Sequence, residues 1–105
     1  MLDKTLKKIV GYLIKVAAPE KIILFGSMAS GKQNVYSDID LLVITNIIQE
    51  KKNMVDQITG FINELSLKSD VLIHSEVEIE KASMLPFSFL GSIVKEGKII
   101  YQKSC

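Results

Sequence analysis

Hydrophobic residues near the N-terminus recur at steps of three and four, which is the spacing of one helix face. This pattern runs from Leu2 to Ala17, and Pro19 then ends it, because proline cannot continue a helix. A β-branched apolar run follows over residues 21–26 and stops at a glycine, as a buried strand would. A second such run, residues 38–45, opens with acidic residues and becomes uniformly apolar. The first part of the chain therefore predicts a helix and two buried strands.

The middle of the chain predicts a helix, a strand and a second helix. Residues 49–67 again show an apolar helix face, and residues 69–74 form a third strand-like run that begins with acid. Ser75 and Glu78 have the spacing of a capping box, in which each side chain bonds the other residue's backbone N–H. We therefore expect a short helix that starts after Ser75 and extends to about Met84.

The last part of the chain predicts one more helix and a final strand. Pro86 breaks the preceding helix, Ser88 can cap a helix that runs to Glu96, and Gly97 suits the position after its end. Residues 98–102 have the composition of a short strand. The order helix, strand, strand, helix, strand, helix, helix, strand predicts an α/β (α+β) fold with a small mixed sheet backed by helices. The strand order stays open.

Two features of this part of the chain allow two interpretations each. The apolar segment 84–90 either packs the last helix onto the sheet, which we favour, or forms a docking patch for a partner. His74 lies four residues after Asp70, hence on the same strand face. It is either close to a functional site or, as we prefer, an ordinary histidine at a strand end.

Composition limits the class of protein. A chain of 105 residues that is 48% hydrophobic suits a single globular domain, residues 1–105. All 13 basic residues are lysines, against 12 acidic ones, so sequence-specific nucleic-acid binding lacks its usual arginine contacts. The single cysteine, Cys105, allows no internal disulfide. No apolar stretch reaches the length of a membrane span, and we expect a cytoplasmic protein.

The candidate chemistry lies at two strand ends. Gly26 and Ser27 follow the first strand, and Asp38 and Asp40 open the second. Alternate residues of a strand face the same side, so the two carboxylates lie about 6.6 Å apart along it and can hold divalent cations. Glycine permits close approach of the backbone to a phosphate, and serine adds a hydroxyl and N–H groups. The alternative is a plain turn beside a solvated strand start.

These residues resemble a known signature. The segments Phe25-Gly-Ser-Met-Ala-Ser-Gly31 and Ser37-Asp-Ile-Asp-Leu-Leu-Val43 are similar to that of the minimal nucleotidyltransferases, within the DNA polymerase beta nucleotidyltransferase superfamily. The segment Lys95-Glu-Gly-Lys-Ile-Ile-Tyr101 is similar to the end of short family members, and the order of elements matches the family core. The resemblance covers nearly the whole chain. It implies the nucleotidyltransferase fold.

The resemblance also implies a role for each site residue. Asp38 and Asp40 are expected to bind two Mg²⁺ ions, and Asp70, at the start of the third strand, is expected to complete the metal and catalytic set. Gly26 and Ser27 would hold the phosphates of ATP. The implied reaction moves a nucleoside monophosphate, AMP from ATP, onto an acceptor hydroxyl.

One position departs from the family pattern. Ser30 stands where many members carry arginine, and Lys32 is the nearest cation for the nucleotide's phosphates. Lysine neutralises phosphate as a point charge but cannot form arginine's paired hydrogen bonds. This substitution leaves open an alternative function as a binding module that inhibits its partner by occlusion, without catalysis.

The resemblance implies a protein partner as well. Larger relatives add a domain for their acceptor, so we expect the acceptor surface on another protein. Short members pair with a small helical HEPN-type toxin and act as its antitoxin, in some cases by adenylylating a tyrosine. A homo-oligomer is a further expectation.

Overall fold

The computed structural model describes residues 2–26, 39–47 and 49–103. Its elements follow the expected order, and they are, along the chain, α1 (Leu2–Ala17), β1 (Lys21–Phe25), β2 (Ile39–Ile44), α2 (Lys51–Glu64), β3 (Ser69–His74), α3 (Glu76–Ser83), α4 (Phe89–Glu96) and β4 (Lys98–Gln102). The predicted helices and strands are therefore confirmed within the described residues, with ends that differ by up to three residues. The α/β fold class is confirmed too.

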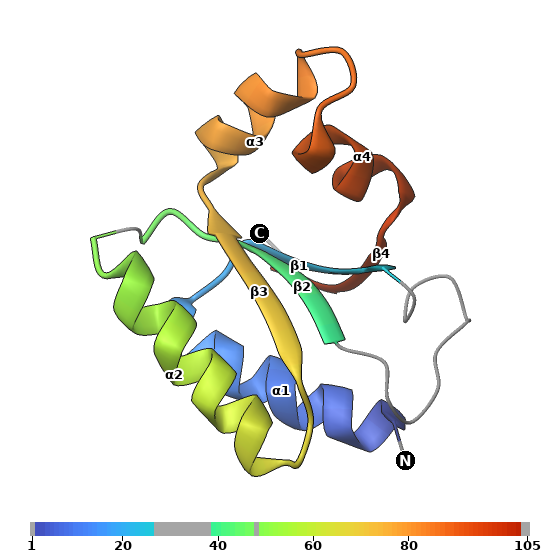
Figure 1. Ribbon diagram of the computed structural model, residues 1–105. Coiled ribbons are helices and arrows are strands. Elements are labelled where there is room, and N and C mark those ends of the chain that lie inside the picture. The colour runs from blue at the N-terminus through green and yellow to red at the C-terminus, as the bar shows by residue number, and fades with distance from the viewer. Residues whose placement is uncertain (1, 27–38, 48, 104–105) are drawn as a thin grey trace.

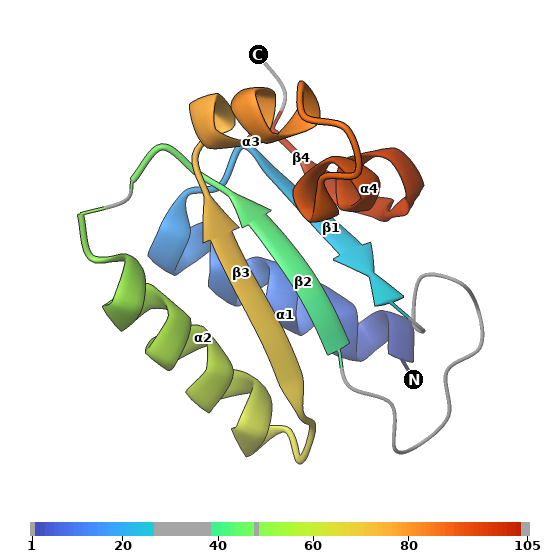
Figure 2. The ribbon, with the colours of Figure 1, turned by 45° about the horizontal axis from the view of Figure 1, so that its top comes forward.

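The four strands form one mixed sheet in the order β3-β2-β1-β4. Strand β1 pairs antiparallel with both β2 and β4, whereas β2 and β3 run parallel. Parallel neighbours need a crossover connection, and helix α2 provides it. The sheet lies between two pairs of helices, with α1 and α2 on one face and α3 and α4 on the other (Figure 1, Figure 2).

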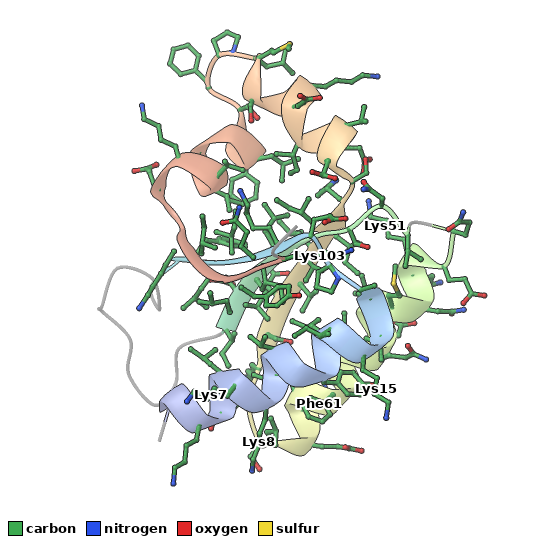
Figure 3. All side chains as sticks on the ribbon, turned by 180° about the vertical axis from the view of Figure 1, so that it is seen from behind. Lys7, Lys8, Lys15, Lys51, Phe61 and Lys103 are labelled. Carbon is green, nitrogen blue, oxygen red and sulfur yellow. The ribbon has the colours of Figure 1, made fainter. Side chains whose placement is uncertain are left out.

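Helices α1 and α2 cover the larger of two hydrophobic clusters. Every second residue of β1 and β2 points toward this face, because side chains alternate along a strand. The stacked rings of Tyr12 and Phe61, with centroids 4.2 Å apart, join the two helices. On the outer side of α1, Lys7, Lys8 and Lys15 are exposed (Figure 3). The fully buried residues of this cluster are Ile9, Leu13, Ala17, Ile22, Leu41, Val43, Ile58 and Ile62.

The opposite face of the sheet carries a smaller cluster. It consists of Ile23, Leu42 and Ile44 from the sheet with Ile79 of α3 and Ile93 of α4. Fewer buried residues attach α3 and α4 to the sheet than attach α1 and α2. The candidate site lies on the face with the smaller cluster.

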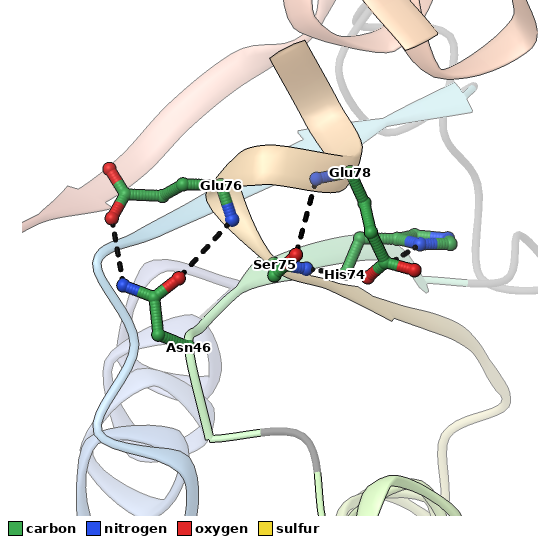
Figure 4. Close-up of polar contacts among 5 residues, drawn as sticks. All are labelled: Asn46, His74, Ser75, Glu76 and Glu78. Atoms are coloured by element: carbon green, nitrogen blue, oxygen red, sulfur yellow. Dashed lines mark hydrogen bonds and ion pairs between the residues drawn. The ribbon is translucent and has the colours of Figure 1, made fainter. Parts of the chain in front are cut away.

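Helix α3 begins with the predicted capping box. The Ser75 hydroxyl accepts a hydrogen bond from the Glu78 backbone N–H at 3.2 Å, and the Glu78 carboxylate accepts one from the Ser75 N–H at 2.8 Å (Figure 4). Asn46, in the segment after β2, accepts from the Glu76 N–H and donates to its carboxylate. The predicted Ser88 cap of α4 is also present, with its hydroxyl accepting from the Gly91 N–H.

The interpretation of segment 84–90 as packing is wrong for most of its apolar side chains. Met84, Leu85, Phe87 and Phe89 are between 64% and 104% exposed. They lie in or beside the turn between α3 and α4. Both helices are short, and the turn that joins them extends beyond the surface of the sheet. Only Leu90 packs against the smaller cluster.

The described helices contain no segment that is both long and apolar enough to cross a membrane.

Candidate active site

Two of the predicted acids meet at the beginning of the parallel strand pair. Asp40 of β2 lies directly opposite Asp70 of β3 in the register of the sheet. Both side chains belong to the face that holds Leu42 and Leu72, because these residues are two positions further along their strands. Adjacent strands lie about 4.8 Å apart, so the two carboxylates are neighbours. Asp40 is half-buried, whereas Asp70 is exposed.

Gly26 brings the end of β1 against Asp40. Phe25, the last residue of β1, pairs with Asp40, and Gly26 follows it with a φ of +75°. A Cβ atom on Gly26 would overlap the Asp40 carboxylate. The left-handed backbone favours glycine here, and any larger residue would also push the Asp40 carboxylate from its place. The backbone at Gly26 consequently lies in contact range of the Asp40 carboxylate.

The other predicted site residues, Ser27, Lys32 and Asp38, lie outside the described residues, as does Ser30. In the described part of the chain, no group of three or more acidic, histidine or cysteine side chains comes together. Asp40 and Asp70 are thus the part of the expected metal set that the described residues supply. Carboxylate oxygens are the ligands that Mg²⁺ prefers. Two adjacent carboxylates repel each other, and a bound divalent cation would relieve that repulsion. The pair fits the expected metal.

His74 lies at the far end of β3 from Asp70. It pairs with Ile44 in the sheet, and its Nδ1 atom is 3.5 Å from a Glu78 carboxylate oxygen (Figure 4). The structure thus favours the interpretation of His74 as an ordinary strand-end histidine beside α3. It does not belong to the acid pair.

A pocket that the sequence did not reveal opens next to Gly26. It has a volume of about 410 Å³ and lies between the end of β1 and helix α4, lined by Phe25, Gly26, Phe89, Ser92, Ile93, Glu96 and Gly97. Phe25 and Gly26 belong to the first motif, and Glu96 and Gly97 belong to the segment 95–101 that resembles the end of short family members. Phe89, Ser92 and Ile93 come from α4, and no periodicity or spacing links any of the α4 side to the first strand.

Two neighbouring carboxylates, one of them in contact with a glycine at one end of a mixed sheet, are an arrangement suited to handling phosphates with divalent cations. The chain belongs to the polymerase beta nucleotidyltransferase family, because the family model "Polymerase beta, Nucleotidyltransferase" matches residues 7–105. It is a nucleotidyltransferase, and the expectation drawn from the two motifs is confirmed at this level.

Relatives with known names or structures agree with this assignment. A Methanocaldococcus jannaschii protein named "putative protein adenylyltransferase" is 33% identical over 84 residues, which cover 78% of each chain. The crystal structure of a "putative nucleotidyltransferase" from Sulfolobus solfataricus is similar with a TM-score of 0.63 at 23% identity, covering 95% of this chain and 79% of that one. A toxin-antitoxin structure with AMP-PNP is similar with a TM-score of 0.63 at 20% identity, covering 92% and 73%. These two structural likenesses support the fold.

Proposed function

We propose that this nucleotidyltransferase transfers AMP from ATP to a hydroxyl group of a partner protein, and that the partner is a toxin of the HEPN type. The observation that carries the proposal is the acid pair Asp40 and Asp70 in register beside Gly26. The relative named a protein adenylyltransferase supports a protein acceptor, and the toxin-antitoxin neighbour with AMP-PNP supports a toxin and an adenine nucleotide.

In the proposed reaction the acceptor oxygen forms a bond to the α-phosphorus of ATP, and the bond between the α-phosphorus and the bridging oxygen breaks. Pyrophosphate leaves with that oxygen. Mg²⁺ ions held by Asp38, Asp40 and Asp70 would supply neutralisation of the phosphate charge. Gly26 and Ser27 hold the triphosphate through their backbone, so that the leaving group lies in line with the attacking oxygen. Lys32 adds a positive charge for the phosphates.

Asp70 has a separate task in this scheme. It is the more exposed of the two described acids and lies on an edge strand, so an acceptor approaching from outside meets it first. It orients the acceptor hydroxyl and favours loss of its proton as the new bond forms.

The test is transfer of labelled AMP from ATP, with Mg²⁺, onto the product of the neighbouring gene as candidate partner, followed by mass spectrometry of that protein. Asp70→Asn should keep ATP and partner binding and lose most transfer. Asp56→Asn is the matched control, since Asp56 is an exposed aspartate on α2, on the other side of the sheet. It should transfer AMP at the parent's rate.

Protection of cells from the toxin separates this proposal from inhibition by occlusion. If protection and transfer both disappear with Asp70→Asn, the proposal stands. If Asp70→Asn protects as well as the parent, and AMP is found on the toxin with neither, transfer to this partner is not the function.

A further inference from the structure

The pocket beside Gly26 has two aromatic walls. The rings of Phe25 and Phe89 have centroids 6.1 Å apart and are nearly perpendicular, at 84°. Ile93, which is 4% exposed, adds a buried aliphatic surface, and Gly97 adds bare backbone. Cavities of this kind, with apolar walls and few polar groups, suit a flat ring.

This pocket and Asp70 lie on opposite sides of Asp40. Strand β1 lies between β2 and β4, so the pocket is on the opposite side of Asp40 from Asp70. Phe25 is the direct neighbour of Asp40 in the sheet, about one strand spacing of 4.8 Å away. With the α-phosphate of the nucleotide at Asp40, the acceptor would lie on the β3 side. The ribose would lie over β1, on the other side, and the base would lie in the pocket.

The polar side chains of the pocket, those of Ser92 and Glu96, are available as acceptors. The Ser92 hydroxyl donates its proton to the Phe89 carbonyl at 2.7 Å, which leaves its lone pairs available. The Gly97 N–H is already donated to the Ile93 carbonyl at 2.7 Å. The Glu96 carboxylate, on the exposed rim, accepts hydrogen bonds and donates none when ionised. A ligand that complements these groups presents N–H donors.

We propose that this pocket binds the base of the nucleotide and that Glu96 accepts a hydrogen bond from the exocyclic amine of that base. The proposal rests on the nucleotidyl transfer proposed above and adds a specificity determinant to it. Adenine carries such an amine. Uracil carries carbonyl oxygens at its exocyclic positions, and the lone pairs of these oxygens would be repelled by the carboxylate. The pocket thus favours ATP over UTP.

The experiment compares three ligands by calorimetry in the presence of Mg²⁺, namely ATP, purine riboside 5′-triphosphate, which lacks only the amine, and inorganic tripolyphosphate. The parent should bind ATP about tenfold more tightly than the amine-free analogue, as a hydrogen bond to a charged group predicts. Glu96→Ala should bind the two nucleotides equally. Because both nucleotides carry the same phosphates, their affinity ratio cancels any general effect of the lost charge.

Glu64→Ala is the matched control, because Glu64 is also an exposed glutamate in the last turn of a helix but lies on α2, across the sheet. It should keep the parent's tenfold ratio, and tripolyphosphate should bind all three proteins alike. A tenfold ratio that persists in Glu96→Ala would overturn the base pocket and leave nucleotide binding intact. Failure of the parent to bind ATP would instead overturn the proposed function, and the pocket assignment with it.

Phe89 provides an independent variant. Its side chain is 64% exposed, so Phe89→Ala should fold. Loss of an aromatic surface beside a base should weaken ATP binding about fivefold or more and leave tripolyphosphate unchanged. Equal losses for the two ligands would contradict the assignment of this wall to the base.

Discussion

Asp70 of β3 lies directly opposite Asp40 of β2, on the sheet face against which α3 and α4 pack. The strands are parallel, so both carboxylates stand near the beginnings of their strands rather than at opposite ends. Two negative charges at this spacing repel each other, and a divalent cation between them removes the repulsion. Under the proposed function, the pairing of these two strands places two metal ligands side by side.

Metal binding should depend on the acids of β2. In Asp38→Asn with Asp40→Asn, binding of Mg²⁺ or Mn²⁺ in the presence of ATP should fall below detection, because two of three expected ligands lose their charge. Calorimetry measures it, and circular dichroism should report an unchanged fold, since the site lies at a polar strand end. Parent-like, nucleotide-dependent metal binding in this double variant would sink the metal assignment.

Two glycines should respond in opposite ways to alanine. Gly26→Ala forces a Cβ into a left-handed backbone and onto the Asp40 carboxylate, so it should cost about 1–2 kcal/mol of stability and weaken ATP binding more than tenfold. Gly60 lies within α2, where an added Cβ would meet no other part of the molecule within 4 Å. Gly60→Ala should therefore raise the unfolding free energy by up to about 1 kcal/mol and leave ATP binding unchanged. Urea unfolding and calorimetry together check both, and unaltered ATP binding in Gly26→Ala would reduce Gly26 to a turn residue.

The buried hydroxyl of Thr45 ties the end of β2 to the end of α1. Thr45 is fully buried, donates to the Ala17 carbonyl at 2.7 Å and accepts from the Ile47 N–H at 3.2 Å. Thr45→Val keeps the shape but leaves both backbone groups unpaired, which should cost about 1–3 kcal/mol in urea unfolding. Thr45→Ser retains the hydroxyl and should cost less than Val. The reverse ranking would mean that the methyl group, not the hydrogen bonds, matters at this position.

The capping box of α3 should weaken in acid. The hydrogen bond from the Ser75 backbone N–H lowers the pKa of the Glu78 carboxyl below its usual value, and the charges of Lys51 and His74 act in the same direction. A group whose pKa is lowered by folding stabilises the native state above its unfolded pKa, near 4.3, and loses that contribution as pH falls through the folded pKa.

Glu78→Ala should therefore cost about 0.5–1 kcal/mol at pH 7, and the difference from the parent should shrink as the pH is lowered past about 4. Urea unfolding at a series of pH values measures it. Glu80→Ala, on the same short helix, should match the parent at pH 7 to within about 0.3 kcal/mol. A Glu78 effect that grows in acid would have the wrong sign for this explanation.

The elements of this fold were predictable because their signals are local. The apolar spacing of α1, the Ser75 and Glu78 pair and the acid at the start of β3 each lie within a few residues of one another. The order of strands was not predictable, because pairing joins distant segments and depends on how the helices pack. The family resemblance implied that Asp40 and Asp70 belong to one site, but that they stand side by side is visible only in the register of the sheet.

Gly97 illustrates the limit of local rules. The sequence assigned it to the end of α4, where glycine often adopts a left-handed conformation. The structure gives it a φ of −72°, which any residue can adopt. A Cβ at this position would instead collide with Ile23 of β1 and with the Ile93 carbonyl. The glycine is needed because the chain passes close to the sheet there, and that proximity is invisible until β1 and α4 are placed together.

The parallel register of β2 and β3 also fixes which face of the sheet carries Asp70. A shift of β3 by one residue would turn Asp70 to the α1 and α2 face and bring Val71 to the other, since side chains alternate along a strand. The same slip would take Val71 and Ile73 out of the larger hydrophobic cluster and turn Asp70 toward it, so the apolar pattern of β3 opposes the slip. Under the proposed function, the packing of the core therefore also determines where the two carboxylates of the site stand.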